Sequence, residues 1–272
     1  MNRIRVLQEL SLPGALRNED AVAHGAGFAA LLDGATSLVR TEHDAVWFTR
    51  CFLALYRTAM EAGLDIPAAV NSVIARMRED YPELRDLGKA EYYSSAAGIL
   101  VRLNGEKLEL FAIGDCTALL QYRDGRWERI HKDDVDRFDD QVLDQMRQIH
   151  RTEGLSLPET MALPAVREHL LKNRSLMNQP GGYRILSFNM APVTQGEILR
   201  FPVGELKRVV LFSDGFDSMQ ERFYADGIDL QDLYQQLRSF ELRDSALEAF
   251  PRFKLHDDAS AILFDVVSAE GG

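Results

Sequence analysis

Apolar positions in the first third of the chain recur with the period of a helix. Between residues 42 and 62, large apolar side chains stand three or four positions apart, and Gly63 follows them. This spacing predicts an amphipathic helix that ends at the glycine. A second helix is expected from about Asp65, whose carboxylate can accept a hydrogen bond from the first turn, with Pro67 inside that turn.

Elsewhere, short apolar runs bounded by turn residues predict strands. Two pairs, Asn104-Gly105 and Asp124-Gly125, separate such runs, and pairs of this kind are typical of β-hairpins. For residues 92–131 we therefore expect a four-stranded antiparallel meander. Other apolar runs predict further strands at residues 3–9, 20–32, 183–188, 197–201, 208–212 and 261–267.

The order of these elements favours an α+β fold. Hairpin turns join several strands, so the sheets should be mainly antiparallel, and the helices come in separate blocks, with short ones after Asp214. The expected architecture is a four-layer α/β/β/α sandwich, in which two mainly antiparallel sheets are flanked by helices. We expect a single domain over residues 1–272, because no repeat or linker divides the sequence. Residues 133–178 are polar, and we expect them to form a helical excursion from that domain.

Composition and charge narrow the range of partners. With 272 residues, of which 46% are hydrophobic, the chain can bury a sizeable core. Its net charge of −11 argues against a nucleic-acid or anionic-membrane partner, although a metal ion could invert the local charge for a phosphorylated substrate. The two cysteines lack metal-type spacing, and neither a signal-peptide pattern nor a membrane-spanning run is present in the sequence. A reduced, cytoplasmic location is therefore expected.

Aspartates stand beside the ends of several predicted strands. Asp33, Asp115 and Asp214 follow apolar runs, whereas Asp20 and Asp257 precede them. Carboxylates gathered at one end of a sheet repel each other unless a cation holds them, and oxygen ligands suit Mg²⁺ or Mn²⁺. Aspartate at a strand end is also common in ordinary turns. The residues alone therefore leave two interpretations open, a shared metal site and a set of unrelated turns.

Five motifs together resemble a known family. They are NED, LLDGATS, FAIGDCTALL, VVLFSDGFD and HDDASAILF, and they span residues 18–265. The metal-dependent serine/threonine protein phosphatases, known as the PPM or type 2C family, have the same order of motifs: N-E/Q-D, D-G, G-D-S-R-A, T/S-D-G and D-N-x-S/T. The resemblance implies an α/β/β/α sandwich. It also implies two Mn²⁺ or Mg²⁺ ions at one end of the sandwich, with a weaker third ion.

The resemblance further implies roles for individual residues. Asp33 would bridge the two ions, and the carbonyl group of Gly34 would bind one of them. Asp214 and Asp257 would bind the other ion. Two further aspartates would complete the set, one by holding metal-bound water and one as a ligand of the third ion: Asp20 and Asp115, respectively.

The activity implied by the resemblance is hydrolysis of phosphoserine and phosphothreonine in proteins. A hydroxide that bridges two divalent ions would attack phosphorus in line, because metal binding lowers the pKa of water. Asp33 and Asp214 would be catalytic through the ions that they hold. The expected partner is a phosphorylated protein substrate.

The sequence departs from the family pattern at four places, one of which is Cys116-Thr117 in place of the S-R of G-D-S-R-A. The common loop D-G-H-G-G is replaced by DGATS at residues 33–37, so the family histidine is absent. The position of the family's phosphate-binding arginine is Ala15, and Arg17 is the nearest substitute, either for bidentate phosphate binding or as a surface residue. Within HDDAS, Asp258 stands at the position of the family's asparagine.

These departures leave a second function open. A pseudophosphatase would keep the fold and use it to bind a partner without turnover. A phosphatase of the haloacid-dehalogenase type fits less well, since Ala35 stands where its second aspartate is required and no alternating βαβ pattern follows.

Overall fold

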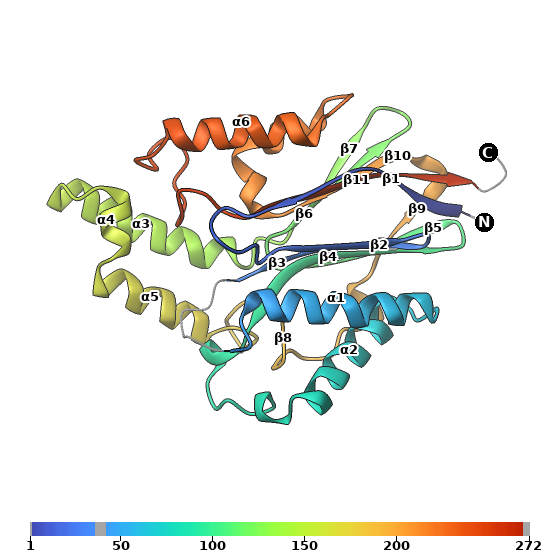
Figure 1. Cartoon of the computed structure of the whole chain (residues 1–272), viewed down its shortest axis with the longest axis horizontal. Helices are drawn as coiled ribbons and strands as arrows, with labels where there is room; N and C mark the ends of the chain where they lie inside the picture. Colours follow the sequence, from blue (N-terminus) through green and yellow to red (C-terminus); the bar gives the residue numbers. More distant parts are fainter. Residues whose placement is uncertain (1, 36–41, 269–272) are drawn as a thin grey trace.

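Two antiparallel sheets pack face to face in the computed structural model, which describes residues 2–35 and 42–268 (Figure 1). The strands of the first sheet are, in order, β1 (Asn2–Leu12), β11 (Ala259–Ser268), β10 (Leu206–Phe212), β6 (Thr117–Tyr122) and β7 (Trp127–Ile130). Those of the second sheet are β2 (Ala21–Gly25), β3 (Phe28–Gly34), β4 (Ser95–Asn104), β5 (Lys107–Ile113) and β9 (Leu199–Pro202), with β8 (Leu186–Ser187) paired to β4.

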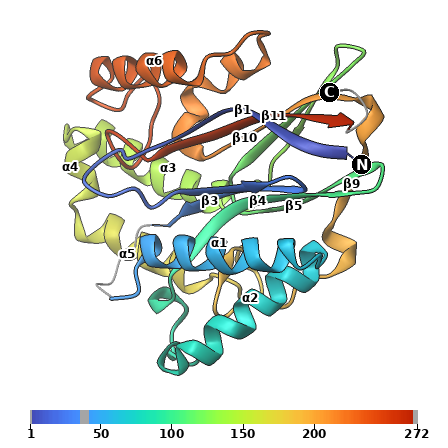
Figure 2. The same cartoon turned by 45° about the vertical axis from the view of Figure 1, so that its right-hand side comes forward.

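Helices cover the outer face of each sheet, as Figures 1 and 2 show. Helices α1 (Ala45–Glu61) and α2 (Ile66–Asp80) lie against the second sheet, and α6 (Leu230–Arg243) lies over the first sheet beside the 3₁₀ helix η5 (Asp214–Tyr224). The four-layer α/β/β/α sandwich expected from the sequence is confirmed. Shorter 3₁₀ helices occupy connections at Pro82–Leu84, Ala90–Tyr92, Gln195–Glu197 and Val203–Glu205.

The strands that lead to the aspartates are buried on both faces. In β3, Leu31 faces the core between the sheets, whereas Leu32 packs toward α1. In β10, Leu211 faces the same intersheet core and Phe212 packs under η5 and α6. A strand covered on both sides has no polar face, which explains why the apolar runs before the aspartates are continuous rather than alternating.

The local signals for helices and turns hold in the structure. The Asp65 carboxylate accepts a hydrogen bond of 2.8 Å from the Ala68 amide and caps α2. Asp44 caps α1 in the same way through the Trp47 amide. Hairpins form at Asn104-Gly105 and at Asp124-Gly125, where both glycines have a positive φ.

The predicted four-stranded meander is wrong, because its two hairpins belong to different sheets. Strands β4 and β5 pair in the second sheet, whereas β6 and β7 pair in the first. The chain crosses between the sheets over residues 114–116, where Gly114 has a φ of +71°. Hairpin signals specify pairing only across their own turn, so they carry no information about which sheet the next hairpin joins.

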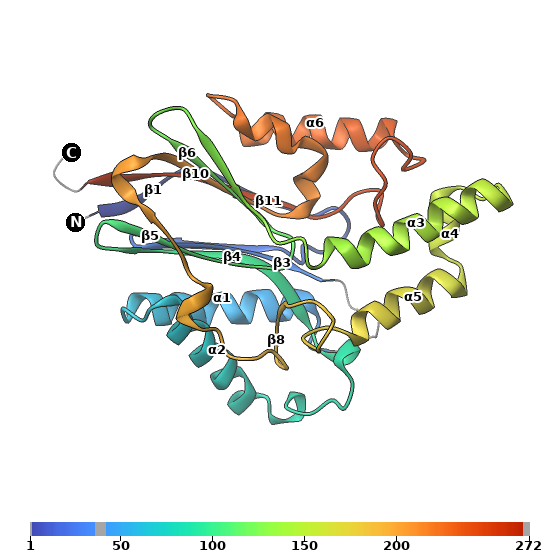
Figure 3. The same ribbon diagram turned by 180° about the vertical axis from the view of Figure 1, so that it is seen from behind.

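The polar segment after β7 forms three helices at one end of the sandwich (Figure 3). They are α3 (Asp136–Glu153), α4 (Leu157–Met161) and α5 (Pro164–Ser175). A small apolar cluster joins them to Leu247 and Phe253, which belong to the loop before β11. Among the described helices, none combines the length and apolar character that a bilayer span requires.

Replacing Gly114 by alanine should destabilise the fold. A Cβ atom there would lie 2.5 Å from the Cβ atom of Ala97, in addition to the strain of a positive φ. We expect Gly114→Ala to lower the free energy of unfolding by roughly 2–4 kcal/mol in urea titrations. Gly125→Ala is the matched control, because its φ is also positive but its Cβ would meet no atom within 4 Å. Equal losses in the two variants would contradict this account of the crossing.

Candidate metal centre

A cavity of about 390 Å³ lies where strands of both sheets end. Five aspartates line it, and four of them stand at strand ends, each at a different connection. Asp33 lies near the end of β3, Asp115 in the crossing from β5 to β6, Asp214 just beyond β10, and Asp257 just before β11. Because the packed strands fix these positions, the four carboxylates are held together by the core rather than by contacts with each other.

Gly34 lines the same cavity, and the structure supplies a reason for its lack of a side chain. A Cβ atom at this position would lie 2.4 Å from the carbonyl oxygen of Glu19. The end of β3 therefore approaches the loop before β2 more closely than any other residue would allow. This approach brings the connection that carries Asp20 next to the one that carries Asp33.

The carboxyl groups in the cavity are closer than their charges favour. The side chains of Asp33 and Asp214 lie close enough to each other that a shared proton or a cation is needed between them. Burial, and then the charges of Asp20 and Asp115, raise the pKa of Asp33 well above its ordinary value. Burial, followed by the charges of Asp33 and Asp257, does the same to the pKa of Asp214. The ionised state of this group thus needs compensating positive charge.

Asp20 is buried behind the cavity and is fixed by one hydroxyl group. Ser213 Oγ donates to Asp20 Oδ2 over 2.8 Å and accepts a hydrogen bond from the Ser260 amide. Asp20 Oδ1 is buried without a hydrogen-bond partner in the described part of the chain. Burial raises the pKa of Asp20 to about 8, although hydrogen bonds from Ser213 and Ser260 oppose that shift. An orphaned carboxylate oxygen at this depth has the chemistry of a ligand for metal-bound water.

The consecutive aspartates before β11 point to different places. Asp257 lines the cavity, and Lys254 Nζ lies 2.7 Å from its Oδ1 atom. Asp258 instead accepts hydrogen bonds from the amides of Gly14 and Glu19, at 2.8 and 2.6 Å. Asp258 therefore ties the loop between β1 and β2 to the start of β11. Only the first member of the pair contributes a carboxylate to the cavity.

Lys254 places a positive charge among these carboxylates. Burial alone would lower the pKa of its ammonium group, but the nearby charge of Asp257, with Asp214 and Asp33 in addition, raises that pKa. The ammonium group therefore stays charged and occupies space beside a candidate metal ligand.

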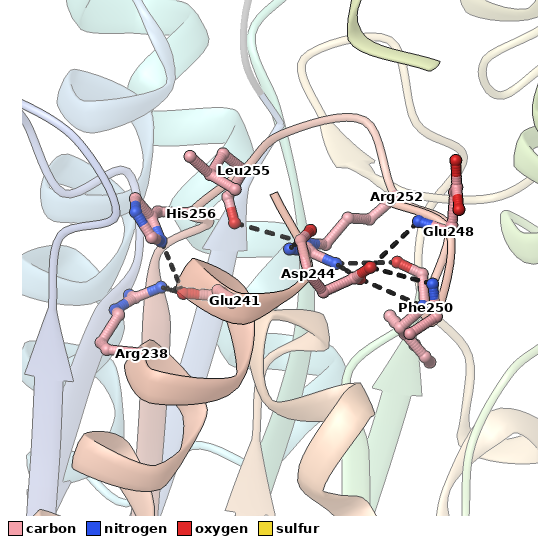
Figure 4. A network of polar contacts seen from close by, with 9 residues as sticks. Arg238, Glu241, Asp244, Glu248, Phe250, Arg252, Leu255 and His256 are labelled. Carbon is pink, nitrogen blue, oxygen red and sulfur yellow. Dashed lines mark hydrogen bonds and ion pairs between the residues drawn. The ribbon is translucent and has the colours of Figure 1, made fainter. Parts of the chain in front are cut away.

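A network on α6 holds the loop that carries Asp257 (Figure 4). Glu241 is 2% exposed and accepts hydrogen bonds from Arg238, while His256 Nδ1 lies 2.7 Å from its Oε2 atom. Arg238 also donates a hydrogen bond of 2.6 Å to the carbonyl oxygen of Asp257. The backbone of Asp257 is thus fixed to α6 by a buried ion pair.

The same loop is folded around a second carboxylate in Figure 4. Asp244 accepts hydrogen bonds from the amides of residues 248–250 and from the Arg252 guanidinium, which lies 2.7 Å away. These contacts give a connection without regular secondary structure a defined path, and so fix the positions of Lys254 and Asp257.

The opposite wall of the cavity comes largely from α3, α5 and the segment after α5. Asp139 and Arg174 are its charged residues, and Tyr183 lies beside the guanidinium group. Burial raises the pKa of Asp139 to about 7, and the positive charge of Arg174 opposes this shift. Apart from Asn173, the remaining lining of this wall is apolar: Val135, Phe138, Met161, Leu170, Ile185 and Phe253.

The structure gathers most of the residues predicted from the sequence, with one exception. Asp33, Gly34, Asp115, Asp214 and Asp257 line one cavity, and Asp20 lies directly behind it. Their roles as ligands stay predictions. Arg17 is exposed and pairs with Asp44 at 2.6 Å, so it is not among the described residues that line the cavity. In the DGATS loop, Thr36 and Ser37 lie outside the described residues.

Sequence reasoning missed three charged residues of the cavity, Asp139, Arg174 and Lys254. Lys254 had a signal, since it stands three positions before Asp257 and two before the motif HDDASAILF. Asp139 and Arg174 belong to the polar segment, where no motif marks them. Their place in the cavity depends on how α3 and α5 pack.

The donor set fits hard divalent cations. Asp33, Asp115 and Cys116 offer ligand atoms within 4.8 Å of one another. Burial, and then the charge of Asp33, raise the pKa of the Cys116 thiol, so it lacks the thiolate form that binds metals. Oxygen ligands remain, and together with the orphaned oxygen of Asp20 they suit Mg²⁺ or Mn²⁺.

The carboxyl pKa values predict how stability should change with pH in metal-free protein. A buried carboxyl with a raised pKa binds more protons in the folded than in the unfolded chain, so stability falls as pH rises through that window. For Asp20 the window runs from 3.8 to about 8. We expect the Tm to fall between pH 6 and pH 8, by about 2–4 °C per pH unit for each such group.

Two controls accompany that measurement. Saturating Mn²⁺ should raise the Tm most at pH 8, because ionised carboxylates bind the ion. Asp20→Asn should reduce the pH dependence, and Asp124→Asn, at an exposed turn, should leave it unchanged. A metal-free Tm that is constant or rises between pH 6 and pH 8 would contradict the raised pKa values.

Removing the Lys254 ammonium group should strengthen metal binding. Because this cation contacts Asp257, it competes with any ion that the carboxylate would bind. We expect Lys254→Met to lower the Kd for Mn²⁺ by roughly two- to tenfold in calorimetry, since partial exposure of the pair screens the interaction. Lys207→Met is the matched control, because Lys207 pairs with Asp226 at 2.9 Å away from the cavity. An unchanged or raised Kd for Lys254→Met would show that the ammonium group does not compete.

Comparisons with known proteins agree with this geometry. A family model described as protein phosphatase 2C matches residues 14–250, a stretch that contains Asp20, Asp33, Asp115 and Asp214 but ends before Asp257. No curated protein has a sequence that matches this chain.

Several solved structures share the fold. The catalytic domain of the serine/threonine protein phosphatase PstP in complex with two manganese ions is 20% identical, with a TM-score of 0.54 over 98% of this chain and 100% of that chain. The serine/threonine phosphatase Stp1 from Staphylococcus aureus is 13% identical, with a TM-score of 0.57 over 97% of this chain and 96% of that one. PstP/Ppp from Mycobacterium tuberculosis is 22% identical, with a TM-score of 0.54 over 97% and 98%. At these identities the likeness shows the fold alone. Because the family model covers most of the sequence, the chain belongs to the protein phosphatase 2C family.

Proposed function

We propose that this protein is a metal-dependent phosphatase that hydrolyses phosphoserine and phosphothreonine in proteins. The observation that carries the proposal is the charge of the cavity. Its described lining contains five carboxylates, of which four come from strand ends, and two cationic side chains, a balance of −3 if all are ionised. An anionic substrate would enter such a site only if bound cations reversed that charge.

The chain offers a ligand arrangement for two divalent ions. Asp33, at the centre of the group, would bridge them, with the carbonyl group of Gly34 on one ion and Asp214 and Asp257 on the other. Asp115 would hold a weaker third ion, and Asp20 would orient metal-bound water. Such ions supply a water of lowered pKa and positive charge for the phosphoryl oxygens.

Other residues would hold these ligands in position. Ser213 holds one oxygen of Asp20, and Asp258 holds the loop that precedes it. Arg238 holds the backbone of Asp257. The apolar side chains of the α3–α5 wall limit water around the site, which strengthens electrostatic interactions there. Structures with the same fold support the reaction class, since they are serine/threonine phosphatases and one of them is in complex with two manganese ions.

The alternative is a pseudophosphatase that binds a partner without turnover. The absent family histidine favours it, whereas the full set of strand-end carboxylates favours an enzyme. The two readings differ in one measurable property, metal-dependent hydrolysis.

Asp214→Asn should abolish that hydrolysis. We expect Mn²⁺-dependent release of phosphate from a phosphoserine peptide to fall by about 100-fold or more, since even an outer partner of a metal ligand is worth 10–100-fold. Asp124→Asn, at an exposed Asp-Gly turn, should retain wild-type activity. Wild-type protein that binds Mn²⁺ yet hydrolyses neither this peptide nor p-nitrophenyl phosphate would establish the pseudophosphatase instead.

A further inference from the structure

Arg174 is a buried cation whose donors are incompletely used. It lies at the end of α5, is 9% exposed and lines the same cavity as the strand-end aspartates. Its Nη2 atom donates to the carbonyl oxygen of Ala35 over 3.2 Å. Its Nε atom is buried and has no hydrogen-bond partner among the described residues.

No described carboxylate forms an ion pair with this guanidinium. The nearest acidic influence is Asp139, whose negative charge Arg174 stabilises without a direct bond in the described structure. By contrast, the partly buried guanidinium groups of Arg238 and Arg252 are each paired with a carboxylate at 2.7 Å. The contacts of the guanidinium in the described structure are neutral groups, the Ala35 carbonyl and the Tyr183 side chain. Burying a cation without a paired carboxylate costs several kcal/mol, so this position suits an anion that comes from outside the chain.

We propose that Arg174 binds the phosphoryl oxygens of the substrate. This inference rests on the proposed function and adds a residue to it. The guanidinium is a planar fork suited to two phosphate oxygens, and the cavity that it lines also contains the carboxylates that would hold the metal ions. A phosphate bound in this cavity would have the guanidinium donors of Arg174 on the helical wall within reach.

The sequence lacks an arginine at the position of the family's phosphate-binding residue, and Arg174 offers one from another segment. The family's phosphate-binding arginine has no counterpart at Ala15, and the nearby Arg17 is engaged with Asp44 at the start of α1. The hydrogen bond to the Ala35 carbonyl places Arg174 directly after the Asp33-Gly34 pair. Helix α5 thus brings a guanidinium group to the loop that follows β3.

The test is binding of inorganic phosphate to Mn²⁺-loaded protein, measured by calorimetry, together with phosphoserine-peptide kinetics. For Arg174→Met we expect the Kd for phosphate and the KM for the peptide to rise by at least tenfold, and kcat/KM to fall by about 100-fold. Arg174→Lys keeps the charge without the fork, so its losses should be smaller. The Kd for Mn²⁺ should change little in both variants, because Arg174 contacts no candidate ligand side chain directly.

Arg167→Met is the matched control, since Arg167 lies on the same helix and is exposed. It should bind phosphate as wild type does. If Arg17→Met lost phosphate binding while Arg174→Met did not, the proposal would be overturned in favour of the arginine suggested by the sequence. Equal phosphate affinity in wild type and in Arg174→Lys and Arg174→Met would overturn it as well, as would a wild-type protein that binds no phosphate.

The phosphate measurement separates this inference from the proposed function. A wild-type protein without hydrolytic activity, whose phosphate binding is lost in Arg174→Met, would contradict the phosphatase and support the phosphate-binding role of Arg174. Thermal unfolding of each variant shows whether it is folded, and Arg174→Lys keeps the test decisive if the methionine variant is not.

Discussion

The end of this sandwich depends on one constraint, the crowding of carboxylates beyond what their charges favour. Asp33 and Asp214 lie close together, Asp20 is buried with one oxygen orphaned, and Asp115 and Asp257 line the same cavity. The acids at these strand ends do not stabilise the fold, because burying each charge costs free energy. The core of the two sheets outweighs that cost, and the arrangement persists because strands buried on both faces cannot shift to separate the acids.

Hydrogen bonds and an ion pair outside the cavity hold the crowded carboxylates in place. Ser213 joins β10, β11 and Asp20 through two hydrogen bonds. Asp258 binds the backbone of the loop between β1 and β2 through two hydrogen bonds. Its neighbour Asp257 instead directs its carboxylate to the cavity. The buried pair of Arg238 and Glu241 then fixes Asp257 from the side of α6. Each link removes a motion by which one acid could move away from the others, which is the condition for a preorganised cation site.

Much of this arrangement could be predicted from the sequence because its cause is local. An apolar run followed directly by Asp, as at Asp33 and Asp214, specifies a buried strand and an acid at its end. The order of the layers follows from hairpin signals and helical periodicity, because each sheet and each amphipathic helix needs an apolar surface to pack against. The sheet to which a hairpin belongs is not local, and neither is the packing of a polar helix. The crossing at Gly114 and the approach of Arg174 to Ala35 both depend on contacts between segments far apart in the chain, so no short pattern records them.

The two walls of the cavity are built by different means, one from strand ends and the other mainly from helices. The strand ends supply four carboxylates. The two cationic side chains of the lining come from other segments, Arg174 from α5 and Lys254 from the loop before β11. Lys254 is paired with Asp257, whereas Arg174 has a buried donor without a hydrogen-bond partner among the described residues. Ala35 departs from the family loop D-G-H-G-G and accepts a hydrogen bond from Arg174, so this departure lies where the helical wall meets the end of β3. A side chain on α5 can reach the cavity without any change in the strands, because the packed core between the sheets fixes the strand ends independently of that helix.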